Sequence, residues 1–162
     1  MLVRRLFAFV LIFCAASSGW AHNGHTHPEA AHITHVMKRQ FDRPDAPLSV
    51  APVTVVGDAA VAAWSQQGKG GRALLRKEKA GWSIHVCAGK GLTQAEVLAL
   101  SGLPQSQADD LARRVVQAEA SLPASQRALF DSFEGVLKVG GDGAAAHGHG
   151  HQAPRPASGH SH

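Results

Sequence analysis

The first periodic segment of the chain is typical of an amphipathic helix that begins near Pro28. Thr26 can cap this helix, and Glu29 can complete a capping box. The apolar residues fall on one face at helical spacing: Ile33, Val36, Met37 and Phe41. His32 and His35 fall on the opposite, polar face. The pattern therefore predicts a helix that packs one side on a core and exposes two histidines.

From residue 48 onward the apolar pattern changes from helical spacing to β-branched runs. Residues 50–56, 59–65, 71–77 and 82–88 predict strands, and Pro52 places the first of them at a sheet edge or bulge. The turns between them are short, which favours an antiparallel four-stranded meander. In the last strand, alternation puts Trp82, Ile84 and Val86 on the core face under the N-terminal helix. Ser83, His85 and Cys87 then share the other face.

Helical patterns return after the glycines at 89 and 91. Thr93 and Glu96 predict a second capping box, and that helix ends at Gly102 and Pro104. The next helix runs from about 106 to 122, with Leu111, Val115 and Val116 facing inward. Leu129, Phe130 and Phe133 form an apolar cluster, and residues 133–139 fit a helix or a last strand. The sequence predicts an α+β fold in which an N-terminal helix packs on the meander and two or three short helices follow.

Composition divides the chain into four segments. Arg4 and Arg5, an apolar run over 6–16 and a small-x-Ala site ending at Ala21 predict a cleaved secretory signal peptide, residues 1–21, with an uncleaved anchor as the alternative. A His-rich segment (22–28), a single α+β domain (29–139) and a flexible Gly/His-rich tail (140–162) follow. Cys14 leaves with the signal, so Cys87 has no intramolecular disulfide partner.

The chain contains 11 histidines, and most lie in the two outer segments. Low apolar content predicts a mobile tail, and short His-rich tracts are typical of metal binding. The tail ligands are His147, His149, His151, His160 and His162. After cleavage, His22 offers its α-amino group and ring to one ion, together with His25 or His27. Imidazole favours Cu(II), with Zn(II) and Ni(II) as alternatives; a low-complexity tail and a frayed terminus without bound metal are the competing interpretations.

Two further pairs are candidate metal ligands. His32 and His35 are three residues apart on the predicted helix, although exposed helical histidines are often only solvated. His85 and Cys87 would form a mixed nitrogen–sulfur pair, although an ordinary strand face with a small buried thiol fits as well. Cu(I) is less favoured, because soft ligands are scarce: the mature chain has one methionine, Met37, and one cysteine.

Charge and motifs argue against other classes of function. Loss of Arg4 and Arg5 with the signal lowers the formal net charge from +4 to +2. The sequence has no cluster of Lys and Arg on one face, so it gives no support to nucleic-acid binding. Paired carboxylates, a nucleophile signature and a cofactor motif are all absent, so we expect no enzymatic activity.

Four blocks of the sequence, at 33–58, 62–64, 70–77 and 81–89, resemble the bacterial copper uptake system-associated protein family. These are small secreted proteins with His-rich tails, encoded near periplasmic copper chaperones and outer-membrane copper receptors. The resemblance implies a periplasmic role in copper acquisition or handling, and it implies Cys87 alone as a functional residue. It also leaves an alternative: a module that docks such a chaperone or receptor through a polar sheet face with Arg72, Arg76 and Cys87, the His tail being secondary.

Overall fold

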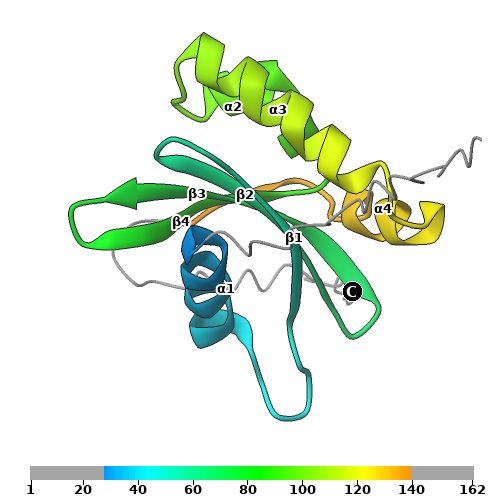
Figure 1. Ribbon diagram of the computed structural model, residues 1–162. Coiled ribbons are helices and arrows are strands. Elements are labelled where there is room, and N and C mark those ends of the chain that lie inside the picture. Colours follow the sequence, from blue (N-terminus) through cyan, green and yellow to red (C-terminus); the bar gives the residue numbers. More distant parts are fainter. Residues whose placement is uncertain (1–27, 140–162) are drawn as a thin grey trace, which may run out of the picture.

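A central antiparallel sheet carries one helix on one face and a group of helices on the other (Figure 1). The computed structural model describes residues 28–139. In chain order the elements are α1 (Pro28–Phe41), β1 (Ser49–Val56), β2 (Ala59–Gln66), β3 (Lys69–Glu78), β4 (Gly81–Ala88), the 3-10 helix η1 (Lys90–Thr93), α2 (Ala95–Leu100), α3 (Gln105–Glu119), α4 (Ala124–Asp131) and β5 (Val136–Lys138). This order confirms the predicted α+β architecture. The predicted signal peptide, His-rich segment and tail lie outside the described residues, apart from Pro28.

The sheet is a meander in which consecutive strands pair, in the order β1-β2-β3-β4-β5. Residues 133–139 fitted either a helix or a last strand, and the structure shows the short strand β5 there. The described sheet therefore has five strands where four were predicted. Pro52 lies in the edge strand β1, where the pairing with β2 shifts between Val50 and Val53, as expected for an edge or bulge. β2 and β3 join through Gln67 and Gly68, which have φ of 49° and 74°. Positive φ at both turn residues is what a tight two-residue hairpin requires.

A bulge in β4 changes which side chains meet the N-terminal helix. Leu74 pairs with Val86 but the next residue, Leu75, pairs with Ile84, so His85 is an extra residue. Cys87 therefore joins Trp82 and Ile84 in the core under α1, while Val86 joins the core on the opposite face. The predicted alternation is thus wrong from Val86 onward, because a bulge reverses the faces of all later residues.

Each face of the sheet has its own core. Under α1, Ile33 and Met37 pack against sheet residues that include Leu75. On the other face, residues of η1, α2 and α3 pack against the sheet, among them Leu92, Leu98, Leu111 and Val115. Val116, predicted to face inward, is 54% exposed; it lies one position, or about 100° of helix rotation, beyond the buried Val115.

Two local predictions in the C-terminal half are also wrong. Thr93 does not cap α2: it is the last residue of η1, and its hydroxyl donates to the carbonyl of Lys90. The predicted apolar cluster of Leu129, Phe130 and Phe133 is divided between two places. Phe130 is buried beneath the guanidinium of Arg72, whereas Phe133 meets Trp64 edge to face on the α1 side. The short stretch after α4 therefore carries the chain from one layer to the other.

Candidate functional site

The predicted ligands are distributed unevenly between the described and the undescribed parts of the chain. Eight histidines lie outside the described residues: His22, His25, His27, His147, His149, His151, His160 and His162. His32, His35, His85 and Cys87 lie within them. The predicted ligands that the structure describes therefore lie on two elements, α1 and β4.

His32 and His35 are exposed on the outer face of α1, as predicted. Both line a surface groove that lies between α1 and the β3–β4 turn. The remaining lining residues are Pro28, Glu29, Val36, Arg39, Lys77, Ala80, Gly81 and Trp82. Residues three apart on a helix have neighbouring side chains, so both imidazoles can approach one ion. Pro28, the first described residue, also lines the groove.

The Glu29 carboxylate ties the start of α1 to the sheet. Lys77 Nζ donates to Glu29 Oε1 at 2.6 Å, and Trp82 Nε1 donates to Glu29 Oε2 at 2.5 Å. The Lys77 hydrogen bond, followed by that of Trp82, holds the pKa of Glu29 below its ordinary value. Both oxygens of Glu29 already accept hydrogen bonds, so the imidazoles of His32 and His35 are the groove's main candidate metal ligands.

No three or more His, Cys, Asp or Glu side chains within residues 28–139 gather closely enough to hold a metal ion. His85 is not paired with Cys87 as alternation predicted. Its Nε2 lies 2.9 Å from Glu78 Oε1 and 3.2 Å from Ser83 Oγ. The bulge at His85 accounts for this separation, since it returns Cys87 to the face that carries α1.

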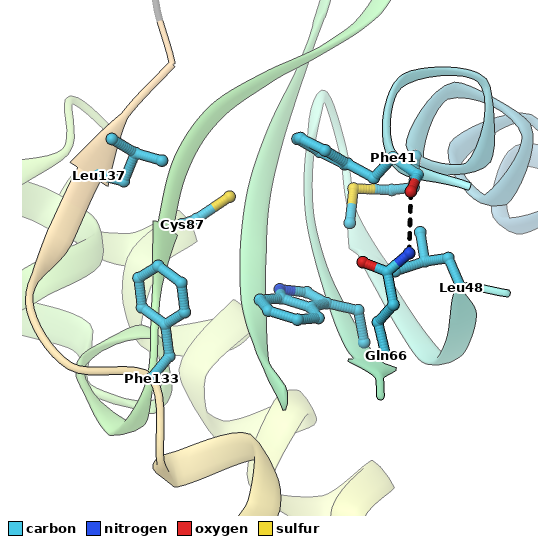
Figure 2. A pocket seen from close by; sticks show the side chains of 8 residues that line it. Phe41, Leu48, Gln66, Cys87, Phe133 and Leu137 are labelled. Carbon is cyan, nitrogen blue, oxygen red and sulfur yellow. Dashed lines mark hydrogen bonds between the residues drawn. The ribbon is translucent and has the colours of Figure 1, made fainter. Parts of the chain in front are cut away.

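Cys87 instead lines a cavity of about 150 Å³ between α1 and the sheet. The other lining residues are Met37, Phe41, Leu48, Trp64, Gln66, Phe133 and Leu137. In Figure 2 the Cys87 thiol points from β4 toward the side where Phe41, Leu48 and Gln66 lie. Burial raises the pKa of this thiol from 9.0 to about 11, so it is protonated near neutral pH.

Two polar groups at this cavity differ in their hydrogen bonding. Gln66 Nε2 donates to the carbonyls of Phe41 and Ala46, at 2.9 and 2.6 Å, and so fastens the end of α1 to β2. Trp64 Nε1 is buried and has no partner among the described residues. Sequence analysis did not connect Met37, Trp64 and Cys87, because they come from three elements far apart in the chain.

No family model, curated protein or solved structure matches the chain. The function is therefore argued from the residues themselves, and the resemblance to the copper uptake family remains a prediction. Among the helices of the described part, none combines the length and the apolar character needed to cross a membrane.

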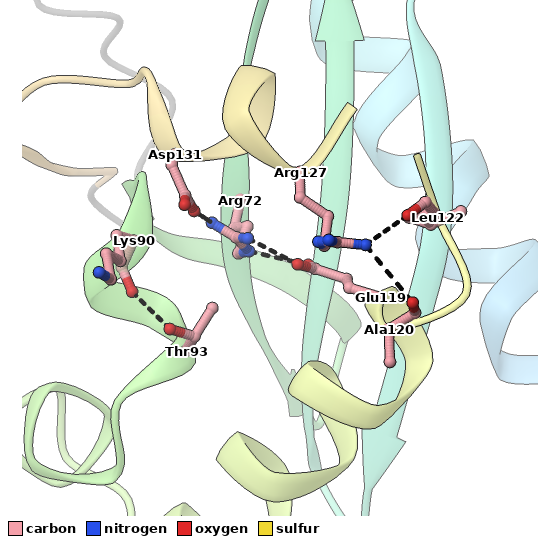
Figure 3. A network of polar contacts seen from close by, with 8 residues as sticks. All are labelled: Arg72, Lys90, Thr93, Glu119, Ala120, Leu122, Arg127 and Asp131. Carbon is pink, nitrogen blue, oxygen red and sulfur yellow. Dashed lines mark hydrogen bonds and ion pairs between the residues drawn. The ribbon is translucent and has the colours of Figure 1, made fainter. Parts of the chain in front are cut away.

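Arg72, predicted on a polar docking face, is instead buried between the helices and the sheet. It donates through Nε and Nη2 to Glu119, at 2.8 and 2.6 Å, and through Nη1 to Asp131 at 2.8 Å (Figure 3). Desolvation opposes its charge, but these hydrogen bonds outweigh it and raise the pKa of Arg72. Glu119 continues the buried row Leu111–Val115, and an acid on an apolar helix face was the sequence signal for this network.

Proposed function

We propose that this is a periplasmic copper-binding accessory protein of copper uptake or homeostasis, which captures or buffers Cu(II) through its His-rich outer segments. The observation that carries the proposal is the distribution of histidine. Eight of the 11 lie in residues 22–27 and 147–162, and two more, His32 and His35, are exposed at the start of the domain. Imidazole prefers Cu(II) to the other divalent first-row metals, with Zn(II) and Ni(II) next in line.

The folded domain supports this role because its own exposed histidines follow the N-terminal His-rich segment closely in the sequence. His27 precedes His32 by five residues, and the groove that contains His32 and His35 begins at Pro28. Two imidazoles from α1 leave coordination positions that other histidines of the chain would fill. Catalysis is not part of the proposal, since the domain would act as a carrier for its ligands.

Copper titration of residues 22–162 tests the proposal. Calorimetry and electron paramagnetic resonance would follow Cu(II) binding to this chain and to a chain in which the five tail histidines are replaced by asparagine (His147→Asn, His149→Asn, His151→Asn, His160→Asn and His162→Asn). We expect the replacement to remove most of the bound Cu(II), and His85→Asn, the matched control, to remove none. Binding by neutral imidazole must also weaken as the pH falls toward about 5 to 6. Full binding after replacement of all eight outer histidines, or binding independent of pH, would contradict the proposal.

A second candidate is docking of a periplasmic copper chaperone or an outer-membrane receptor, with the His tail secondary. The specific observation in its favour is β5, a three-residue edge strand on which Val136 and Leu137 are 61% and 46% exposed. An exposed edge can pair with a strand of another protein. Val136→Lys should then abolish pull-down of the chaperone or receptor without changing Cu(II) binding.

A further inference from the structure

We propose that the cavity between α1 and the sheet is a Cu(I) site in which Cys87 and Met37 supply the two sulfur ligands. The inference rests on the proposed function for the choice of copper. It concerns another oxidation state, other residues and another part of the molecule. A soft thiolate and a soft thioether are the ligands that proteins use for Cu(I).

Two sulfur-bearing side chains that stand 50 residues apart in the sequence line one cavity. Met37 lies on the inner face of α1 with 1% of its surface exposed, and Cys87 lies on β4 with 5% exposed. Both side chains line the same cavity. The bulge at His85 is what points Cys87 to this face, since unbroken alternation would place it with His85 and Ser83. Soft ligands are scarce in the sequence, but the one methionine and the one cysteine of the mature chain line the same cavity.

Charge selects the oxidation state in this cavity. Its walls are mainly aliphatic and aromatic, with the Gln66 carboxamide at one side. Placing net charge in such surroundings is costly. A thiolate bound to Cu(I) has no net charge, whereas a thiolate bound to Cu(II) retains one positive charge. The apolar walls therefore favour Cu(I), in contrast to the imidazole-rich outer segments, which favour Cu(II).

Binding replaces a proton on Cys87. In the free protein the thiol is protonated near neutral pH, as an ordinary cysteine thiol is. Cu(I) would form a bond to Sγ while the S–H bond breaks and its proton passes to solvent, with no change of oxidation state. The thioether of Met37 donates a lone pair and loses nothing. One proton is thus released for each Cu(I) ion bound.

The indole N–H of Trp64, which has no hydrogen-bond partner among residues 28–139, is a second observation that fits a ligand in this cavity. Buried polar groups without a hydrogen-bond partner are rare and call for an explanation. Trp64 lines the cavity, and a thiolate is a better acceptor than the protonated thiol of the free protein. Leu137, which is 46% exposed, brings the cavity to the protein surface at β5 and gives an ion a place of entry.

Anaerobic titration with Cu(I), in competition with a chromogenic Cu(I) chelator, tests the site. The protein is residues 22–162 with all eight outer histidines replaced by asparagine, so that imidazoles outside the described residues do not contribute. We expect one Cu(I) per chain and an ultraviolet thiolate-to-Cu(I) band. Met37→Leu, which conserves the side-chain volume, should weaken binding at least about tenfold. Cys87→Ser should abolish binding, and His85→Asn should leave it unchanged.

The unsubstituted chain gives a readout that does not depend on the folding of any variant. At one equivalent, Cu(I) should release one proton and should give the ultraviolet thiolate-to-Cu(I) band. Absence of that band, or equal affinity in Met37→Leu, would overturn the two-sulfur site. Failure of the two proposals is distinguishable. Loss of Cu(II) binding in the histidine variants tests the outer segments, whereas Cu(I) binding in the sulfur variants tests the cavity.

Discussion

Replacement of Glu119 by glutamine should destabilise the domain strongly, because it removes the buried counter-charge of Arg72. The side chains of Arg72 and Glu119 are 2% and 5% exposed, and two hydrogen bonds join them. Removing one partner of a buried ion pair costs about 3 to 5 kcal/mol. Asp131 still accepts a hydrogen bond from Arg72 and keeps part of the compensation. We therefore expect Glu119→Gln to lower the free energy of unfolding by about 3 kcal/mol, the lower end of that range.

Asp131→Asn is the matched control, because it removes the other carboxylate from the same guanidinium. The Asp131 side chain is 41% exposed, so solvent compensates for its loss and we expect a cost of about 1 kcal/mol or less. Urea unfolding of residues 22–162 at pH 7 measures both variants. With an m-value of about 1.5 kcal/mol/M, the midpoint should fall by about 2 M for Glu119→Gln and by less than about 0.7 M for Asp131→Asn. Equal shifts, or a cost below about 1 kcal/mol for Glu119→Gln, would refute the reasoning from burial.

Three further outcomes follow from local geometry. Gly89→Ala places a Cβ 2.6 Å from a backbone carbonyl oxygen, so it should cost about 1 to 3 kcal/mol in urea unfolding, unlike Gly91→Ala, whose Cβ meets only a side chain at 3.5 Å. Burial raises the pKa of Cys87 from 9.0 to about 11, so the contribution of its protonated thiol to stability is complete below pH 9 and is lost as the pH rises through 11. The difference in free energy of unfolding between the unsubstituted protein and Cys87→Ala should therefore narrow over that range. Trp82→Phe removes a hydrogen bond that lowers the pKa of Glu29, so the pKa of Glu29 measured by NMR titration should rise toward 4.5. An unchanged pKa would show that the Trp82 hydrogen bond does not stabilise the carboxylate.

The parts of the fold that sequence predicted are those set by local pattern. The 3.6-residue spacing of Ile33 and Met37 located α1, and the β-branched run around Val53 located β1. β5 could not be decided, because Val136 and Leu137 are largely exposed and gain their order from pairing with β4. Pairing between distant segments leaves no periodic signal in a strand of three residues.

The chemistry around Cys87 shows why the candidate site was harder to predict than the fold. Alternation along β4 is a local rule, and one bulged residue, His85, is enough to invalidate it for everything that follows. The nearest histidine in sequence is therefore the wrong companion for the thiol, and the neighbour that shares its cavity is Met37 on α1. By contrast, His32 and His35 are related by helix geometry alone, and both are exposed as expected. Sequence spacing is thus a sound guide to which side chains share one helix face, whereas a site assembled between α1 and the sheet depends on strand register.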